Sequence, residues 1–167
     1  QHRQLVAHLA DPVVQVGVQS VCVGTVAQFS DQSVTAPGNP VIHWAWDFGD
    51  GATDTVQAPT HLYAAAGNYL VTLSVTTPYC GNTGTQQVIV EAKPTAAFTS
   101  TPVLGCSPMN VSFTNTSSGA VNYVWAFGDG GGDNAANTSH TYINNGTIDS
   151  VYTVSLIAST AFGCGDT

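Results

Sequence analysis

Charged residues are scarce in this chain, and basic ones are almost absent. Only 7% of the 167 residues are charged, and two basic residues stand against ten acidic ones, which gives a formal net charge of −8 at pH 7. Nucleic acids and anionic membrane surfaces are bound through clusters of lysine and arginine. We therefore expect neither as a partner.

Long apolar runs are missing as well. No stretch approaches the roughly 18 consecutive apolar residues of a membrane-spanning helix, and no segment has the pattern of a signal peptide. At 43% hydrophobic residues, the chain is nevertheless too apolar and too poor in charge for intrinsic disorder. The composition predicts a globular segment that does not insert into a membrane.

Two copies of one unit account for most of the sequence. The alternating aromatic segment Ile42–Phe48 returns as Val121–Phe127, and the strand-like segment Tyr69–Leu73 returns as Tyr152–Leu156. The offset between the copies, ~80 positions, changes only in Gly-, Pro- and Asn-rich stretches, where loops tolerate insertions. The chain is therefore expected to hold two tandem domains of one kind.

Each copy has the period of β-structure. Apolar Tyr69, Val71, Leu73 and Val75 alternate with polar residues, which is typical of a half-buried strand. About seven such short strands per copy predict an all-β fold with two tandem immunoglobulin-like β-sandwiches. No segment has the periodicity of an amphipathic helix.

Four cysteines offer a covalent staple. They allow three pairings, and equal spacing in the two copies favours Cys22 with Cys80 and Cys106 with Cys164. Each disulfide would stabilise its sandwich by roughly 3–4 kcal/mol. Four buried thiols are an alternative, and a zinc site is another, although no Cys-x-x-Cys pair supports it. Paired cysteines predict an oxidising compartment, outside the cell or on its surface.

The most specific signal is a short motif that occurs once in each copy. The first copy reads WDFGDG over 46–51, followed by His-x-Tyr, and the second reads WAFGDG over 125–130, again followed by His-x-Tyr. With these motifs the chain resembles tandem PKD (polycystic kidney disease) domains over nearly its whole length. In style it is similar to PKD arrays of large Bacteroidetes proteins that are cell-surface, gliding or type IX-secreted. The motif positions for which a structural role is expected are Trp46, Asp47, Gly49, Asp50, Gly51, His61, Tyr63, Trp125, Gly128, Asp129, Gly130, His140 and Tyr142.

The resemblance implies an extracellular β-sandwich that is not an enzyme and carries no cofactor. Asp47, Asp50 and Asp54 surround one turn and can in principle hold calcium. Aspartates in Gly-rich turns more commonly accept hydrogen bonds from backbone amides, so we expect no metal. In the second copy Ala126 replaces the first motif aspartate. For the motif histidines we expect hydrogen bonds to the neighbouring loop.

Two candidate modification sites follow from the same resemblance. Some Bacteroidetes O-glycosylate a Ser or Thr between an Asp and an apolar residue, and Asp54-Thr55-Val56 and Asp149-Ser150-Val151 fit that pattern. Thr55 and Ser150 are therefore candidate O-glycosylation sites, at which the chain would be a glycoprotein.

The two ends of the chain predict how units are joined. Residues 85–91 have the pattern of a last strand, the second copy stops soon after Cys164, and residues 4–9 resemble the same last strand. We assign residues 1–10 to a preceding repeat or to donation to a neighbouring copy. Residues 11–92 are the first PKD-like domain, and 93–167 are a second one without its own last strand. A sandwich lacking a strand exposes unpaired backbone groups, so copies of the chain or adjacent repeats in a linear or helical array are the expected partners.

These features predict a structural, non-catalytic segment of an extracellular filament or surface adhesin built from head-to-tail repeats. The alternative is a carbohydrate-binding or spacer module of a secreted hydrolase, with surface glycans as partners. The aromatic residues distinguish the two hypotheses. An exposed platform, for instance at Trp44, favours carbohydrate binding, whereas buried aromatics favour the filament.

Overall fold

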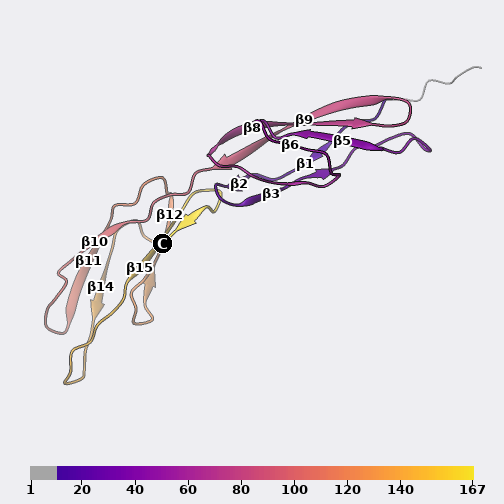
Figure 1. Cartoon of the computed structure of the whole chain (residues 1–167). Coiled ribbons are helices and arrows are strands. Elements are labelled where there is room, and N and C mark those ends of the chain that lie inside the picture. Colours follow the sequence, from indigo (N-terminus) through magenta and orange to yellow (C-terminus); the bar gives the residue numbers. More distant parts are fainter. Residues whose placement is uncertain (1–10) are drawn as a thin grey trace, which may run out of the picture. The chain divides into compact units, whose positions relative to one another are not determined.

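The computed structural model describes residues 11–167 and is built from strands (Figure 1). It divides into two units at Glu91 and Ala92. The predicted all-β fold with two tandem sandwiches is confirmed. Because residues 11–167 form no helix, this part of the chain offers no candidate for a helix that crosses a membrane.

Unit 1 has one large sheet and two short strand pairs. The large sheet runs in the order β2-β9-β8-β5-β6, where β2 is parallel to β9 and the other neighbours are antiparallel. Its strands are β2 (Val21–Cys22), β5 (His43–Asp47), β6 (Thr53–Asp54), β8 (Gly67–Thr76) and β9 (Gly81–Glu91). The strand pairs are β1 (Val16–Gly17) with β4 (Ser30–Asp31), and β3 (Val26–Gln28) with β7 (Thr60–Leu62).

Unit 2 is formed by two antiparallel sheets. The first has the order β10-β11-β14 and the second the order β13-β12-β15-β16. The strands of the first sheet are β10 (Phe98–Thr101), β11 (Met109–Asn115) and β14 (Thr138–Tyr142). Those of the second are β12 (Asn122–Ala126), β13 (Gly132–Asp133), β15 (Ser155–Ser159) and β16 (Gly165–Asp166).

Aromatic side chains form the centre of each core. Trp46 in unit 1 and Trp125 in unit 2 are each only 1% exposed. Phe29 lies 5.8 Å from Trp46 between ring centroids, and Phe113 lies 5.6 Å from Trp125. Large aromatic side chains dominate the energetics of such cores.

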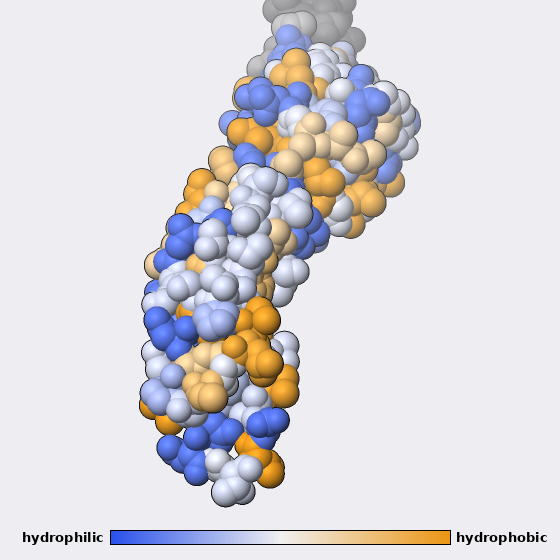
Figure 2. Space-filling model, turned by 90° about the vertical axis from the view of Figure 1, so that its left-hand side faces the viewer, coloured by the Kyte–Doolittle hydropathy of each residue, from blue (hydrophilic) through white to orange (hydrophobic). Residues whose placement is uncertain are grey.

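The outer surface combines apolar patches with weakly polar residues. Figure 2 shows hydrophobic residues in small groups over this face, with pale and hydrophilic residues between them. Val103, Leu104 and Val151 of unit 2 are 81%, 88% and 94% exposed. Large exposed apolar side chains in one neighbourhood indicate a contact surface rather than a solvated one.

The first predicted disulfide, Cys22–Cys80, is wrong. Cys22 is paired with Glu91 at the end of β9, and Cys80 directly precedes Gly81 at the start of the same strand. An 11-residue strand spans roughly 33 Å at about 3.3 Å per residue, whereas a disulfide needs Cα atoms about 4–7 Å apart. The strand therefore holds these two cysteines far apart.

The second predicted disulfide, Cys106–Cys164, is also wrong. Cys106 is an exposed free thiol in the loop before Met109, which pairs with Tyr142. The Tyr142 hydroxyl donates to the carbonyl of Phe127, which directly follows β12. Cys106 therefore lies near the C-terminal end of β12. Cys164 follows the other end of β15, where Ser159 pairs with the first residue of β12. The disulfide-bonded cysteines in residues 11–167 are Cys22 and Cys164. The equal spacing of the cysteines shows that the two copies are equivalent. It does not show which cysteines lie close together.

Candidate functional site

The Asp-Gly motif of unit 1 forms the tight turn between β5 and β6. The Gly49 N–H donates to the Asp47 carboxylate at 2.9 Å, and the Ala52 N–H donates to the Asp50 carboxylate at 3.0 Å. Gly49 has φ +80°, and a Cβ there would lie 2.6 Å from the Leu70 carbonyl oxygen. Both the backbone angle and the close approach require glycine at this position.

An aspartate–histidine pair connects this turn to β7 of the other layer. The Asp50 Oδ2 lies 2.7 Å from the His61 Nε2, and the His61 ring stacks on Phe48 with centroids 4.3 Å apart. Burial opposes ionisation of Asp50, but the hydrogen bonds from His61 and from the Ala52 amide outweigh it and lower the pKa of Asp50 below its ordinary value. The pair therefore fastens the two layers together.

A buried tyrosine completes the same cluster. The Tyr63 hydroxyl donates to the Phe48 carbonyl at 3.1 Å, and the Tyr63 ring meets His61 edge-on at 4.6 Å. Burial, together with the nearby Asp50 carboxylate, raises the pKa of Tyr63 to about 12. We call Phe48, Asp50, His61 and Tyr63 the clamp of unit 1.

Unit 2 repeats the clamp with the equivalent side chains, Phe127, Asp129, His140 and Tyr142. The Asp129–His140 distance is 2.6 Å, the rings of Phe127 and His140 stack at 4.3 Å, and the Tyr142 hydroxyl donates to the Phe127 carbonyl at 3.0 Å. The hydrogen bond from His140 and that from the Gly131 amide lower the pKa of Asp129. Because Ala126 leaves this geometry intact, the first motif aspartate is not part of the clamp.

The candidate calcium ligands of unit 1 have protein partners. Asp47 and Asp50 accept the amide hydrogen bonds of the turn, and Asp54 accepts those of Thr55 and Val56 at 2.6 and 3.1 Å. Among residues 11–167, no group of three or more His, Cys, Asp or Glu side chains is arranged to hold a metal ion. These carboxylates shape the turn.

The candidate glycosylation sites lie on the surface. Thr55 follows β6 and Ser150 precedes β15, and both residues are exposed. A modifying enzyme can reach these hydroxyl groups, and their glycosylation stays a prediction.

The tryptophans do not form a sugar-binding platform. Trp46 and Trp125 are buried in the cores, and their indole N–H groups donate to the carbonyls of Val56 and Ala135, each at 2.9 Å. Trp44 is half-buried, and its indole N–H donates to the Asp31 carboxylate at 2.7 Å. The rings and the indole N–H groups of these tryptophans therefore contribute to the stability of the fold.

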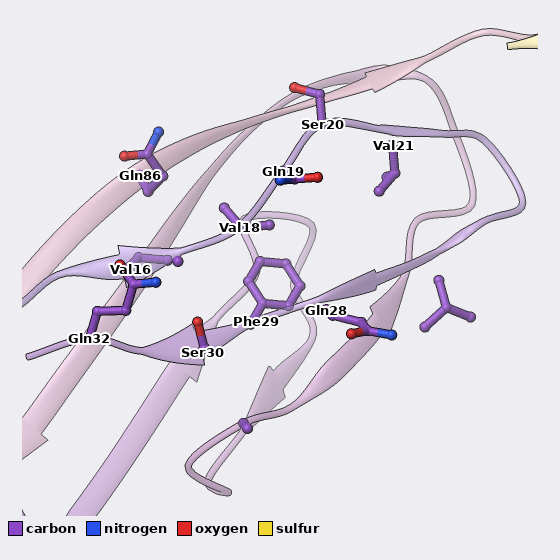
Figure 3. Close-up of a pocket in the computed structure, with 13 residues that line it drawn as sticks. Val16, Val18, Gln19, Ser20, Val21, Gln28, Phe29, Ser30, Gln32 and Gln86 are labelled. Carbon is purple, nitrogen blue, oxygen red and sulfur yellow. The ribbon is translucent and has the colours of Figure 1, made fainter. Parts of the chain in front are cut away.

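A groove in unit 1 was not foreseen from the sequence. It has a volume of about 870 Å³ and lies between the segment 16–21 and the strands β3 and β4. Figure 3 shows Phe29 and Val18 between these segments, with glutamine and serine side chains around them. No charged residue lines the groove; its polar residues are Gln19, Ser20, Gln28, Ser30, Gln32 and Gln86. The alternation of Gln28, Ser30 and Gln32 was the signal available in the sequence.

Comparison with known families decides the identity of the repeated unit. The PKD domain family matches residues 9–92 and again residues 91–167. The chain belongs to the PKD domain family. It consists of two PKD repeats, which are non-catalytic modules.

The relatives of these PKD domains are parts of much larger proteins. A microbial collagenase of Vibrio alginolyticus is 46% identical over 54 residues, which is 32% of this chain and 7% of the collagenase. The pre-pro-metalloprotease PrtV of Vibrio cholerae is 38% identical over 73 residues, 44% of this chain and 8% of PrtV. The chain thus spans less than a tenth of either relative.

Among solved structures, the PKD1 domain of Vibrio anguillarum Epp is 28% identical, with a TM-score of 0.47. The match covers 51% of this chain and 99% of that domain. The collagenase and metalloprotease relatives come from Vibrio, so the expected likeness to Bacteroidetes arrays in particular is not supported.

Proposed function

We propose that the two PKD domains act as a non-catalytic spacer in an extracellular protein, of the kind represented by the collagenase and metalloprotease relatives. The observation that carries this proposal is the clamp, which recurs in both domains with matching partners and distances. The most specific side chains of the motif are thereby used to fix the shape of each sandwich. A domain with a fixed shape and no catalytic role is suited to act as a spacer.

The relatives support the same proposal. Matches of 7% and 8% of the relative's length correspond to one module beside a much larger chain. We infer that these PKD domains are likewise part of a larger secreted protein, in agreement with the alternative hypothesis of a spacer module.

A distance measurement tests the spacer. The chain is placed between two fluorescent reporter domains and compared with a Gly/Ser linker of the same number of residues, which behaves as a flexible coil. We expect a narrower distribution of transfer efficiencies than the linker gives, unchanged by denaturant until the domains unfold cooperatively. A distribution as broad as that of the linker contradicts the proposal.

Carbohydrate binding is a second candidate, favoured by the groove of unit 1. Uncharged amides and hydroxyls around an apolar floor suit a neutral saccharide better than an ion. Co-sedimentation with insoluble polysaccharides tests it. Binding should fall when Gln19 and Gln86 are replaced by Ala, and should persist in a Gln57→Ala control, because Gln57 is exposed and outside the groove. Equal sedimentation of all three proteins rules the groove out.

The head-to-tail filament or surface adhesin is a third candidate, and the collagenase and metalloprotease relatives support the spacer in preference to it. Residues 1–10, which are predicted to join a neighbouring repeat or copy, lie outside the part of the chain that the structure describes.

A further inference from the structure

The first strand of each PKD domain leaves its neighbouring strand at a different point. In unit 2, β10 pairs with β11 as far as Thr101 opposite Ser112. In unit 1, the pairing of β1 with β4 ends at Gly17 opposite Ser30, and the chain then joins the large sheet as β2. The first strand of unit 1 therefore covers less of the edge beside it.

The uncovered positions in unit 1 can be matched to covered positions in unit 2. Phe29 and Phe113 are counterparts, because each packs against the tryptophan of its core. Gln28 is therefore the counterpart of Ser112, which β10 covers in unit 2. In the described part of unit 1, β3 has β7 on one side and no strand on the other. That side of β3 is an open edge.

The main-chain groups of the open edge point toward the missing neighbour. Alternate residues of an antiparallel strand direct their N–H and C=O groups to opposite sides. The Phe29 N–H donates to the Pro59 carbonyl on the side of β7, whereas the Gln32 N–H donates to the segment just before β1. By this alternation, the N–H and C=O groups of Val26 and Gln28 face the side that β1 has left.

The groove of unit 1 lies along this open edge. Val26 and Gln28 line it on one side, and the segment 18–21, which crosses to the large sheet, lines it on the other. Figure 3 shows the side chains of Val18 and Phe29 between these two segments. Open main-chain groups and apolar side chains are therefore available in one groove of about 870 Å³.

These features select an extended polypeptide segment without charge. An added strand is held by main-chain hydrogen bonds, and its alternate side chains give specificity. A side chain opposite the buried Ala27 points inward, where Val18 and Phe29 favour an apolar group. A side chain opposite the exposed Gln28 points outward, and no charged residue lines the groove to pair with a charge there.

We propose that the open edge of β3 binds an extended, uncharged segment of another polypeptide as an added antiparallel strand. This segment takes the position beside Gln28 that β10 takes beside Ser112 in unit 2. The inference does not rest on the spacer proposal, because a rigid domain can exist with its groove filled or empty. It gives the groove a different occupant from the neutral saccharide, which can use the glutamine side chains but has no matching row of main-chain groups.

A peptide titration followed by NMR tests the proposal. The full chain, labelled with ¹⁵N, is titrated with the capped peptide acetyl-Thr-Val-Thr-Val-Thr-amide, whose valines supply the inward side chains and whose threonines supply the outward ones. We expect saturable shifts of the amide signals of Val26 and Gln28. Hydrogen exchange of these two amides should become slower in the complex, because both gain an acceptor.

Two N-methylated peptides form a matched pair that leaves the protein unchanged. Methylation of the central threonine nitrogen removes an N–H group that faces β3 in antiparallel pairing and places a methyl group against the edge. It should weaken binding about tenfold or more. Methylation of the next valine nitrogen removes an N–H group that faces away from β3, so it should change the affinity little.

Two substitutions of Gln28 distinguish a peptide from a saccharide. Gln28→Pro removes the main-chain N–H that faces the groove, and proline is tolerated on the open side of an edge strand. Gln28→Ala keeps this N–H and removes only the side-chain amide. Peptide binding should fall in the proline variant and persist in the alanine variant, whereas a saccharide held by the amide is weakened by both. Melting temperatures show whether the variants are folded.

Three results would overturn the proposal. The first is the absence of saturable shifts at Val26 and Gln28 in the peptide titration. The second is equal binding of the two N-methylated peptides, a comparison that does not depend on how well the proline variant folds. The third is that cellohexaose, a neutral oligosaccharide, saturates the same amide signals and the peptide does not.

Discussion

The imidazole ring of His61 lies flat on the phenyl ring of Phe48, with centroids 4.3 Å apart and planes 2° apart. The imidazole Nε2 lies 2.7 Å from the Asp50 Oδ2, and the Tyr63 ring lies nearly perpendicular to the imidazole, with centroids 4.6 Å apart. The histidine therefore acts as a structural link between the turn after β5 and the strand β7. In unit 2, His140 and Phe127 repeat the relationship at 4.3 Å.

The hydroxyl group of the clamp residue Tyr63 should contribute measurably to the stability of unit 1. Tyr63→Phe removes the hydroxyl that donates to the Phe48 carbonyl and leaves that carbonyl without this donor. We expect a loss of about 1–2 kcal/mol in the free energy of unfolding, measured by urea denaturation. Tyr79→Phe is the matched control, because Tyr79 is 72% exposed. An equal effect of the two substitutions would contradict the role of the hydroxyl.

The clamp also predicts a loss of stability in acid. The folded-state pKa values of Asp50 and Asp129 lie below the ordinary value of 3.8. The stabilisation from each carboxylate is therefore present above that value and is lost as the pH falls through the lower folded-state pKa. Melting temperatures from pH 7 down to pH 2 should fall less steeply in the double variant Asp50→Asn/Asp129→Asn than in the parent.

The control for the acid experiment is Asp149→Asn. Asp149 is exposed and lies in the loop before β15. Its replacement should leave the slope of melting temperature against pH unchanged. Parallel curves for the parent and the double variant would show that the clamp carboxylates do not cause the acid dependence.

The two-residue period predicted the fold because it records which side chains are buried. Val71, Leu73 and Val75 alternate in the sequence, and all three are at most 1% exposed on β8. The turn at the motif could also be predicted from the sequence, because Gly49 and Gly51 permit the positive φ angles that they adopt. These properties are local, and a local pattern is sufficient to reveal them.

Features that join distant segments were not readable in the same way. The parallel pairing of β2 with β9 places Cys22 beside Glu91, and no sequence spacing encodes that contact. The disulfide prediction failed for this reason. The groove of unit 1 likewise depends on how Gln19 and Gln86, far apart in the chain, approach Phe29.

Gly49 should be far less tolerant of substitution than a glycine with the same backbone angle in open space. Gly49 and Gly24 have φ angles of +80° and +79°, but only at Gly49 would a Cβ meet the backbone, 2.6 Å from the Leu70 carbonyl oxygen. Gly24→Ala should cost about 1 kcal/mol from the backbone angle alone. Gly49→Ala should lower the free energy of unfolding clearly more, as measured by thermal unfolding. Equal losses in the two variants would show that β8 can shift away from the added Cβ without a loss of stability.

The cysteines can be distinguished by their chemistry in the folded protein. Cys106 is an exposed free thiol, whereas Cys22 and Cys164 are disulfide-bonded. Iodoacetamide added to the native, non-reduced chain should therefore alkylate Cys106 and leave Cys22 and Cys164 unmodified, as read by peptide mass spectrometry. After reduction and unfolding, both should be alkylated, which controls for peptide detection. Recovery of a disulfide-linked peptide that joins Cys106 to Cys164 would contradict the structure, because the second sandwich holds these residues at opposite ends of β12.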